Sequence, residues 1–246
     1  MKENSSQICG RNPVIEALKS GREIDRILVQ EGAGGSAGKI LSLAKSRGIP
    51  VQYAKKDILD RKAKGSSHQG VIAYVSAYAY ASLEDAFRLA EEGGEPPFLI
   101  LLDEIEDPHN LGAVMRTAEG AGAHGVIITK RRASGITETV AKASAGAVEY
   151  LPCIRVNNMA RTIEELQERG VWVYACDMDG TSYYEQDMTG PAALVIGNEG
   201  SGISRLVREK CDFVVSIPMV GRISSLNASN AAAVLMYEVR KQRDGR

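Results

Sequence analysis

The stretches 192–204, AALVIGNEGSGIS, and 213–243, FVVSIPMVGRISSLNASNAAAVLMYEVRKQR, decide the fold of the C-terminal part of the chain. Each begins with a short apolar run expected of a buried strand, continues through a polar loop and ends in a helix. The loops are rich in small residues, which let backbone N–H and C=O groups approach a ligand closely. Their polar side chains with short reach are those of Asn198, Glu199, Ser224, Ser225 and Asn227. Because ligands bind at the carboxyl ends of strands in α/β domains, these loops predict a binding site.

A third stretch, residues 107–127, DPHNLGAVMRTAEGAGAHGVI, predicts a helix that begins near Asn110. Four apolar residues recur at the spacing of one helix face, namely Leu111, Val114, Met115 and Ala118. Arg116 departs from that face, so we expect its side chain on the loop side of the helix. Taken in order, this stretch and the two above resemble the three motifs of the SpoU/TrmH family of RNA ribose 2'-O-methyltransferases. The motifs are spread over more than half of the chain.

The resemblance implies a C-terminal SPOUT-type domain, in which a parallel sheet is combined with a deep trefoil knot. The alternation of strands and helices after residue 97 independently predicts a largely parallel α/β sheet. Periodicity cannot reveal a knot, which contradicts the usual rule against threading. Family members transfer a methyl group from S-adenosylmethionine to a ribose 2'-hydroxyl and need no metal. They pair as homodimers around the alanine-rich last helix, so the resemblance also implies a homodimer.

Carried over position by position, the resemblance assigns catalysis to Arg116, Asn110, Glu199, Ser225 and Asn227. It assigns cofactor binding to main-chain groups of Gly197, Ile217 and Leu226. Arginine stays protonated in proteins, so it is a poor proton acceptor. We therefore expect Arg116 to bind a phosphate bidentately and to stabilise the developing alkoxide.

Each of these residues also has a purely structural interpretation. Asn110 and Glu199 lie where a side chain can cap a following helix. Ser225 and Asn227 have the turn and cap chemistry that serine and asparagine provide routinely. Without the motif, Arg116 would be a surface arginine in an ion pair, and the two apolar cofactor-binding residues would be core residues.

The first 75 residues predict a small α/β domain in which three strands alternate with helices. In the segment CGRNPVIEAL, Asn12 is the expected helix N-cap and Pro13 the first helical residue. This segment and the later HQGV resemble the family's N-terminal substrate-binding domain, which is similar to ribosomal protein L30e. The resemblance implies an RNA-binding domain at 1–75, a linker at 76–97 and the knotted catalytic domain at 98–246.

Two further segments are expected to be helical. Ser82 and Asp85 resemble an imperfect capping box that opens a short acidic helix within the linker. Residues 137–152, TETVAKASAGAVEYLP, are expected to form one helix that ends in small residues.

Charge is distributed unevenly over a chain whose formal net charge is −1. Residues 1–70 carry 13 Lys and Arg against 7 Asp and Glu, and the remaining residues carry 17 against 24. A basic front part fits an RNA-binding module, because phosphate contacts provide most of the non-specific affinity for nucleic acids. A solvated charged face is the alternative interpretation.

Composition limits the other classes of protein. The content of 44% hydrophobic and 25% charged residues is ordinary for a soluble globular protein. No apolar run approaches the ~20 residues of a membrane span. The N-terminus lacks the apolar segment of a secretory signal, so a cytoplasmic location is expected. The four cysteines have no CxxC spacing, which favours reduced thiols over disulfides or a zinc site.

We therefore expect an S-adenosylmethionine-dependent RNA ribose 2'-O-methyltransferase. The N-terminal module and the overall length resemble most the branch that methylates a guanosine of bacterial 23S rRNA, with a tRNA-modifying relative as the alternative. A non-catalytic RNA- or ribosome-binding protein on the same fold is a second alternative, against which the complete set of motif residues argues. A nicotinamide dehydrogenase is a third, but GAGGSAG at 32–38 does not fit its GxGxxG fingerprint.

Overall fold

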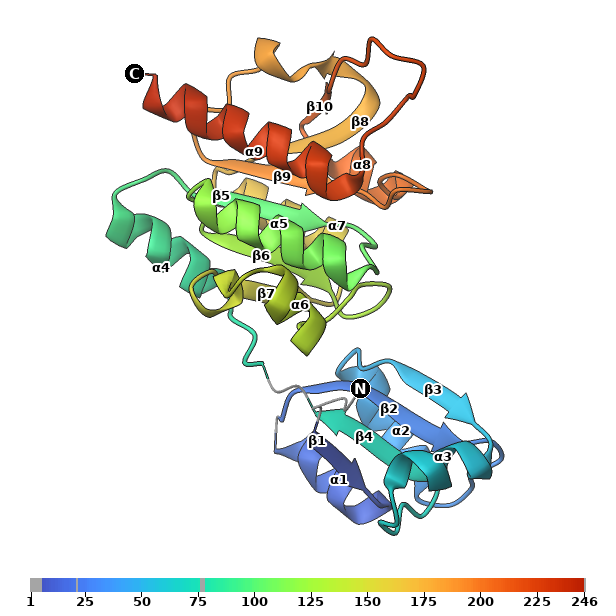
Figure 1. The fold of residues 1–246 in the computed structure, drawn as a ribbon. Coiled ribbons are helices and arrows are strands. Elements are labelled where there is room, and N and C mark those ends of the chain that lie inside the picture. The colour runs from blue at the N-terminus through green and yellow to red at the C-terminus, as the bar shows by residue number, and fades with distance from the viewer. Residues whose placement is uncertain (1–5, 21, 76–77, 246) are drawn as a thin grey trace. The chain divides into compact units, whose positions relative to one another are not determined.

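A computed structural model describes residues 6–20, 22–75 and 78–245, and its contacts divide the chain into the units Met1–Ala79 and Tyr80–Arg246 (Figure 1). The division falls inside the predicted linker of 76–97. Elements of the first unit, in chain order, are β1 (Ser6–Cys9), α1 (Arg11–Lys19), β2 (Ile24–Gln30), α2 (Ala37–Ser46), β3 (Val51–Ala54), α3 (Lys56–Ala63) and β4 (Val71–Val75).

The first unit is a four-stranded sheet with helices on both faces. Its strand order is β1-β4-β2-β3, in which β4 is antiparallel to both neighbours and β2 is parallel to β3. Side chains alternate between the faces of a strand, so Ile27 and Val29 of β2 pack with α1 and α2. Leu28 packs on the other face with α3. The predicted α/β class of this part of the chain is therefore confirmed.

Two expectations for this unit are wrong in detail. The sheet has a fourth strand, β1, which pairs antiparallel with β4. The first helix is preceded by Gly10 at φ +98, and Asn12 lies inside the helix rather than at its N-cap. The ladder with β4 carries the chain to Cys9, so the turn into the helix comes at Gly10, whose positive φ only glycine adopts freely.

The second unit begins with a helix and continues as a strand–helix alternation. Its elements are α4 (Leu83–Gly93), β5 (Phe98–Leu102), α5 (Pro108–Gly120), β6 (Gly125–Thr129), α6 (Glu138–Ala143), the 3-10 turn η1 (Ala147–Glu149), β7 (Cys153–Val156), α7 (Met159–Glu168), β8 (Trp172–Ser182), the 3-10 turn η2 (Tyr183–Glu185), β9 (Ala192–Ile196), α8 (Arg205–Lys210), β10 (Phe213–Ser216) and α9 (Ala228–Asp244). Helix α4 opens with the expected capping box of Ser82 and Asp85.

All neighbouring strands of the six-stranded sheet β10-β8-β9-β5-β6-β7 are parallel, as predicted. Central strands β5 and β9 are buried along their whole length, as expected when helices cover both faces. Leu99 and Leu101 pack with α4, α7 and α8 on one face. On the other face α5 and α9 lie side by side (Figure 1). The guanidinium of Arg243 in α9 lies over the ring of Phe98.

The single helix expected at residues 137–152 is wrong. The segment instead forms α6 and, after a break, the turn η1. The break lies at Ala145 and Gly146, which have φ of +50° and +91°. A left-handed conformation ends an α-helix, and two such residues in succession reverse the chain toward β7.

Candidate active site

Three residues from three distant segments meet at the carboxyl end of the sheet. Asn110 lies in the first turn of α5, Glu199 in the loop after β9, and Asn227 at the N-cap of α9. Asn110 donates from Nδ2 to Glu199 Oε1 at 2.7 Å. Asn227 donates from Nδ2 to Asn110 Oδ1 at 3.0 Å and also to Glu199 Oε1. We call these three residues the amide–carboxylate cluster.

Asn227 connects the cluster to the last helix. Its Oδ1 accepts hydrogen bonds from the backbone N–H of Ser229 at 3.0 Å and from the Ser229 hydroxyl at 2.6 Å. The carbonyl end of the amide therefore caps α9, while the amino end binds the cluster. The structural interpretation of Asn227 as a helix cap is therefore confirmed, and its catalytic role stays a prediction. Asn110, by contrast, is not the N-cap of α5, because Asp107 occupies that position.

The loop after β9 is held in a closed shape by its own backbone. Asn198 and Gly202 exchange two backbone hydrogen bonds, at 3.0 and 2.8 Å. A Cβ at Gly197 would lie 2.3 Å from the carbonyl carbon of Gly202 and 2.4 Å from the nitrogen of Ile203. No side chain fits there, so glycine is needed at position 197 for the loop to close. This closure places Glu199 against Asn110 and Asn227.

Arg116 lies apart from the amide–carboxylate cluster on the same helix. It follows Asn110 by six residues, which is ~9 Å along the axis and ~120° around it. As expected, it departs from the buried face of Leu111, Val114 and Met115, and its side chain is exposed. Among the described residues, its guanidinium makes no hydrogen bond or ion pair, so it is available to a ligand. The ion-pair interpretation therefore finds no partner within the chain that the structure describes.

The loop between β10 and α9 contains the other predicted residues. Ile217 is half-buried, whereas Ser225 and Leu226 are exposed. In the part of the chain that the structure describes, no backbone–backbone hydrogen bond involves residues 217–226. Backbone donors and acceptors of this loop are thus free to bind a ligand. The structure brings together Asn110, Glu199 and Asn227, whereas Ser225 makes no hydrogen bond with them.

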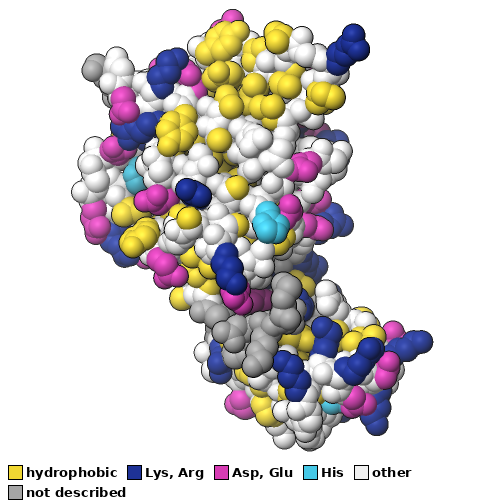
Figure 2. Space-filling model, in the orientation of Figure 1, with side chains coloured by type: hydrophobic (Ala, Val, Ile, Leu, Met, Phe, Trp, Pro, Cys, Tyr) yellow, Lys and Arg dark blue, Asp and Glu magenta, His cyan; other side chains and the backbone are white. Residues whose placement is uncertain are grey.

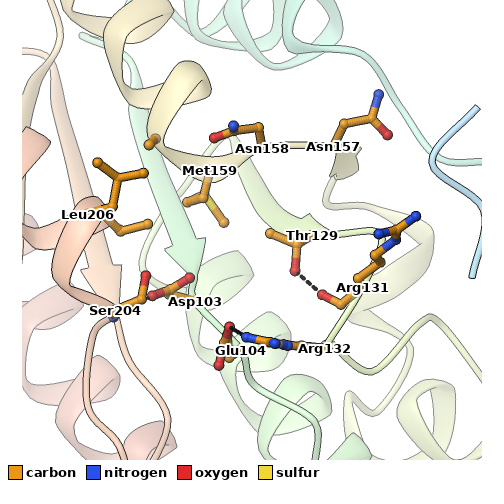
Figure 3. Close-up of a pocket in the computed structure, with 12 residues that line it drawn as sticks. Asp103, Glu104, Thr129, Arg131, Arg132, Asn157, Asn158, Met159, Ser204 and Leu206 are labelled. Carbon is orange, nitrogen blue, oxygen red and sulfur yellow. Dashed lines mark hydrogen bonds and ion pairs between the residues drawn. The ribbon is translucent and has the colours of Figure 1, made fainter. Parts of the chain in front are cut away.

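A cavity of about 230 Å³ lies on the other side of the loop after β9 (Figure 3). It is lined by residues that follow β5, β6 and β7 and by the first residues of α7 and α8. In the sequence, its Arg131 and Arg132 form only a local basic run with Lys130, which does not predict a cavity. In it, the hydrogen bond and charge of Glu104 raise the pKa of the Arg132 guanidinium, which stays cationic.

Comparison with known proteins adds the family. A model described as the SpoU rRNA Methylase family matches residues 97–237. The chain belongs to this family. A second model, described as RNA 2'-O ribose methyltransferase substrate binding, matches residues 7–81. The SpoU family fold thus accounts for the parallel sheet of the second unit, and the trefoil knot expected from the resemblance stays a prediction.

Similar proteins and solved structures support the assignment to the SpoU family. The chain is 50% identical over 246 residues to YacO of Bacillus subtilis (strain 168), which is assigned to the TrmH family of tRNA/rRNA methyltransferases; 99% of this chain and 98% of YacO are covered. A solved structure of the SpoU methyltransferase AviRb from Streptomyces viridochromogenes, in complex with the cofactor AdoMet, has a TM-score of 0.62 at 28% identity and covers 98% of this chain and 91% of AviRb. The TrmH/SpoU tRNA modifying enzyme of A. aeolicus has a TM-score of 0.57 at 26% identity, and the match covers 66% of this chain and 84% of that enzyme.

Two absences hold for the described residues. In that part of the chain, no group of three or more His, Cys, Asp or Glu could hold a metal ion. The described helices also include none that is long and apolar enough to cross a membrane.

Proposed function

We propose that this protein transfers a methyl group from S-adenosylmethionine to a ribose 2'-hydroxyl of RNA. One observation carries the proposal: the amide–carboxylate cluster joins Asn110, Glu199 and Asn227, one from each of the three motifs of its family. A protein that had kept the fold and lost turnover would have no need to keep all three side chains in mutual hydrogen bonds. The non-catalytic alternative is therefore disfavoured.

The loops around the cluster fit the methyl donor. Gly197 closes its loop so tightly that a side chain would collide with the backbone, which fixes the shape of the loop at the strand end. Residues 217–226 offer backbone groups without backbone partners. We therefore assign the donor to main-chain groups of Gly197, Ile217 and Leu226. When bound there, S-adenosylmethionine supplies a methyl group already activated by its sulfonium.

The remaining work falls to the chain's own side chains. The amide–carboxylate cluster presents a fixed carboxylate and amide dipoles at the end of the sheet, where they can orient a ribose. Arg116, exposed and without a partner in the described chain, binds an RNA phosphate bidentately and stabilises the alkoxide that develops on the 2'-oxygen. Ser225, two residues before Asn227 in an exposed loop, closes the pocket on the substrate.

The two units divide the task in this proposal. The domain at 1–75 binds RNA and the domain at 98–246 carries out the transfer, with 76–97 between them. Several Lys and Arg side chains lie on the face of the first unit seen in Figure 2, as phosphate binding requires. We place the reaction in the cytoplasm, where RNA is the available partner.

A homodimer is part of the proposal. Large apolar side chains are exposed on α9 and on the loop before it, among them Tyr237, Val220 and Ile223. Figure 2 shows apolar side chains gathered over part of the second unit. Exposed apolar groups of this kind mark interaction surfaces, and a second copy of the chain would cover them.

For the substrate we favour a guanosine of bacterial 23S rRNA, because a substrate-binding module precedes the catalytic domain. A tRNA is the second candidate, since the A. aeolicus relative modifies tRNA. Mapping ribose methylation in rRNA and tRNA from cells with and without the gene tests this choice. We expect one 23S rRNA guanosine to lose its methyl group when the gene is removed. A lost methyl group in tRNA, with the rRNA unchanged, would overturn the rRNA assignment.

A further inference from the structure

The cavity beside the loop after β9 has walls of two kinds (Figure 3). Polar groups follow three neighbouring strands: Asp103 and Glu104 after β5, Arg131 and Arg132 after β6, and Asn157 and Asn158 after β7. Apolar side chains come from the first turns of α7 and α8, and these are Met159, Leu206 and Val207. Leu206 is 53% exposed, so part of its apolar surface is accessible to a ligand.

The charged side chains of the cavity are two carboxylates and two arginines, and of these Arg131 is left to bind an anionic group. Glu104 is neutralised by Arg132, whose Nη1 lies 2.9 Å from Glu104 Oε1. Asp103 is buried, and its Oδ2 accepts a hydrogen bond from the backbone N–H of Ser204 at 2.7 Å. Arg131 is exposed, and within the described residues its guanidinium has no partner. The backbone of Arg131 is held in place, because its carbonyl oxygen accepts the Thr129 hydroxyl at 2.6 Å.

Size excludes a large ligand. Pockets that enclose a drug-sized molecule have volumes of roughly 300–1,000 Å³. At about 230 Å³ the cavity is too small for S-adenosylmethionine, and none of the residues assigned to the methyl donor lines it. The cavity is suited to a small ligand whose planar ring lies inside it and whose charged group lies at its mouth.

We propose that this cavity is a second nucleotide subsite, which holds one unpaired RNA nucleotide next to the one that is methylated. This inference rests on the proposed function. The phosphate binds Arg131, and the base lies against Leu206 and Met159. Asn158 uses Oδ1 to cap α7 by accepting from the N–H of Arg161 at 3.1 Å, which leaves its Nδ2 to donate to a base edge. Sequence-specific RNA binding commonly uses such splayed-out single-stranded bases.

One loop connects this subsite with the amide–carboxylate cluster. Asn198 donates from Nδ2 to the carbonyl oxygen of Glu104 at 2.9 Å, on the side of the cavity. The next residue, Glu199, accepts the hydrogen bonds of the cluster on the other side. Two ligand positions separated by a single short loop match neighbouring nucleotides of one strand. A nucleotide in the cavity would therefore fix the register of the strand relative to the reacting ribose.

Arg131→Ala and Leu206→Ala test the subsite, with Arg161→Ala and Leu89→Ala as matched controls, since both are exposed residues of the same unit outside the cavity. The probes are end-labelled bulk rRNA and bulk tRNA from cells lacking the gene, in filter binding at several salt concentrations. We expect Arg131→Ala to weaken binding of one RNA about tenfold and to reduce the salt slope by about 0.7 to 1. Leu206→Ala should weaken it about threefold to fivefold without changing the salt slope.

Affinity for S-adenosylmethionine, measured by calorimetry, should be unchanged in both variants, and the controls should bind RNA as the wild type does. RNA binding and salt slope equal to wild type in Arg131→Ala and Leu206→Ala would overturn the subsite, whether or not the wild type transfers methyl groups. Weakened binding by these variants, together with no methyl transfer by the wild type to either RNA, would keep the subsite and overturn the proposed activity. An equal loss in the controls would mean that the effect is not local and would also overturn the subsite.

Discussion

The side-chain amide of Asn227 makes hydrogen bonds through both its oxygen and its nitrogen, so its role as a helix cap can be tested separately from its role in the cluster. Its Oδ1 caps α9, and its Nδ2 donates to Asn110 and Glu199. Aspartate caps a helix as well as asparagine does, but it would set a second carboxylate against Glu199. We predict that Asn227→Asp keeps the cap of α9 and stays folded, with a thermal midpoint lowered only by the repulsion from Glu199, and lowers turnover at least ~10-fold, which corresponds to ~1.4 kcal/mol. Wild-type turnover in a folded Asn227→Asp variant would remove the cluster from the mechanism.

Arg116 provides a second test at the scale of one side chain. Lysine keeps the charge but cannot form the two parallel hydrogen bonds of a guanidinium to a phosphate. We predict that Arg116→Lys leaves the binding of S-adenosylmethionine intact and lowers turnover at least ~100-fold, the scale for losing a preorganised donor. Calorimetry and single-turnover transfer measure the two quantities. Arg161→Lys is the control, and near-normal turnover of Arg116→Lys would exclude it from catalysis.

His124 should make the free energy of unfolding depend on pH. The residue is buried, its Nδ1 accepts the backbone N–H of Phe98 at 3.0 Å, and burial and the charge of Arg243 lower its pKa although Glu95 opposes this. Because the unfolded chain has the ordinary histidine pKa of about 6.5, it takes up the proton before the folded chain does. Stability from this group is thus fully present above pH ~6.5 and is lost as the pH falls below that value, by at most ~1.4 kcal/mol per pH unit.

Urea unfolding at pH 7.5 and pH 5 measures this effect. His124→Asn keeps a hydrogen-bond acceptor that does not titrate, so it should lose less stability over this range than the wild type. The exposed His109 provides the control, and His109→Asn should behave like the wild type. Equal pH dependence of the wild type and His124→Asn would contradict this assignment.

At the scale of elements, α5 depends on a close approach to α6. A Cβ at Gly112 would lie 2.4 Å from the Cβ of Ala143 and 3.0 Å from the carbonyl oxygen of Val140. Because backbone must move to accept it, we predict that Gly112→Ala lowers the free energy of unfolding by about 1–3 kcal/mol. Gly93→Ala, which meets nothing within 4 Å in α4, should not destabilise in urea unfolding. Equal free energies of unfolding of the two variants would contradict this prediction and would mean that α6 can move away from α5 at little cost.

The strands of the second unit could be predicted because they are short apolar runs buried on both faces, such as β5 and β9. Strand β1 could not, since it has only four residues and is formed by pairing with β4, some 60 residues later. The break after α6 could not be predicted from the sequence either. Alanine in the run Ala-Ser-Ala-Gly favours helix, and only the packing of the folded chain makes Ala145 left-handed.

At the scale of the molecule, the site consists of segments that lie far apart in sequence. Residue spacing alone indicated loops at strand ends, and the family resemblance indicated which side chains meet there. Asn110, Glu199 and Asn227 do meet, although Arg116 lies farther along α5 and makes no bond to Glu199 within the described residues. The cavity could not be predicted, because residues after three strands and from the starts of two helices form it, and of these lining residues only Ser204 belongs to a motif.

The most direct test of the account is where on RNA the methyl group is placed. Purified protein is incubated with tritiated S-adenosylmethionine and bulk rRNA or tRNA, and the RNA is then hydrolysed completely in alkali. Alkaline cleavage needs a free 2'-hydroxyl, so a ribose-methylated linkage survives as a dinucleotide. We predict that the label is recovered in alkali-resistant dinucleotides. Label in mononucleotides would mean methylation of a base, and either that result or the absence of label in both RNAs would contradict the account.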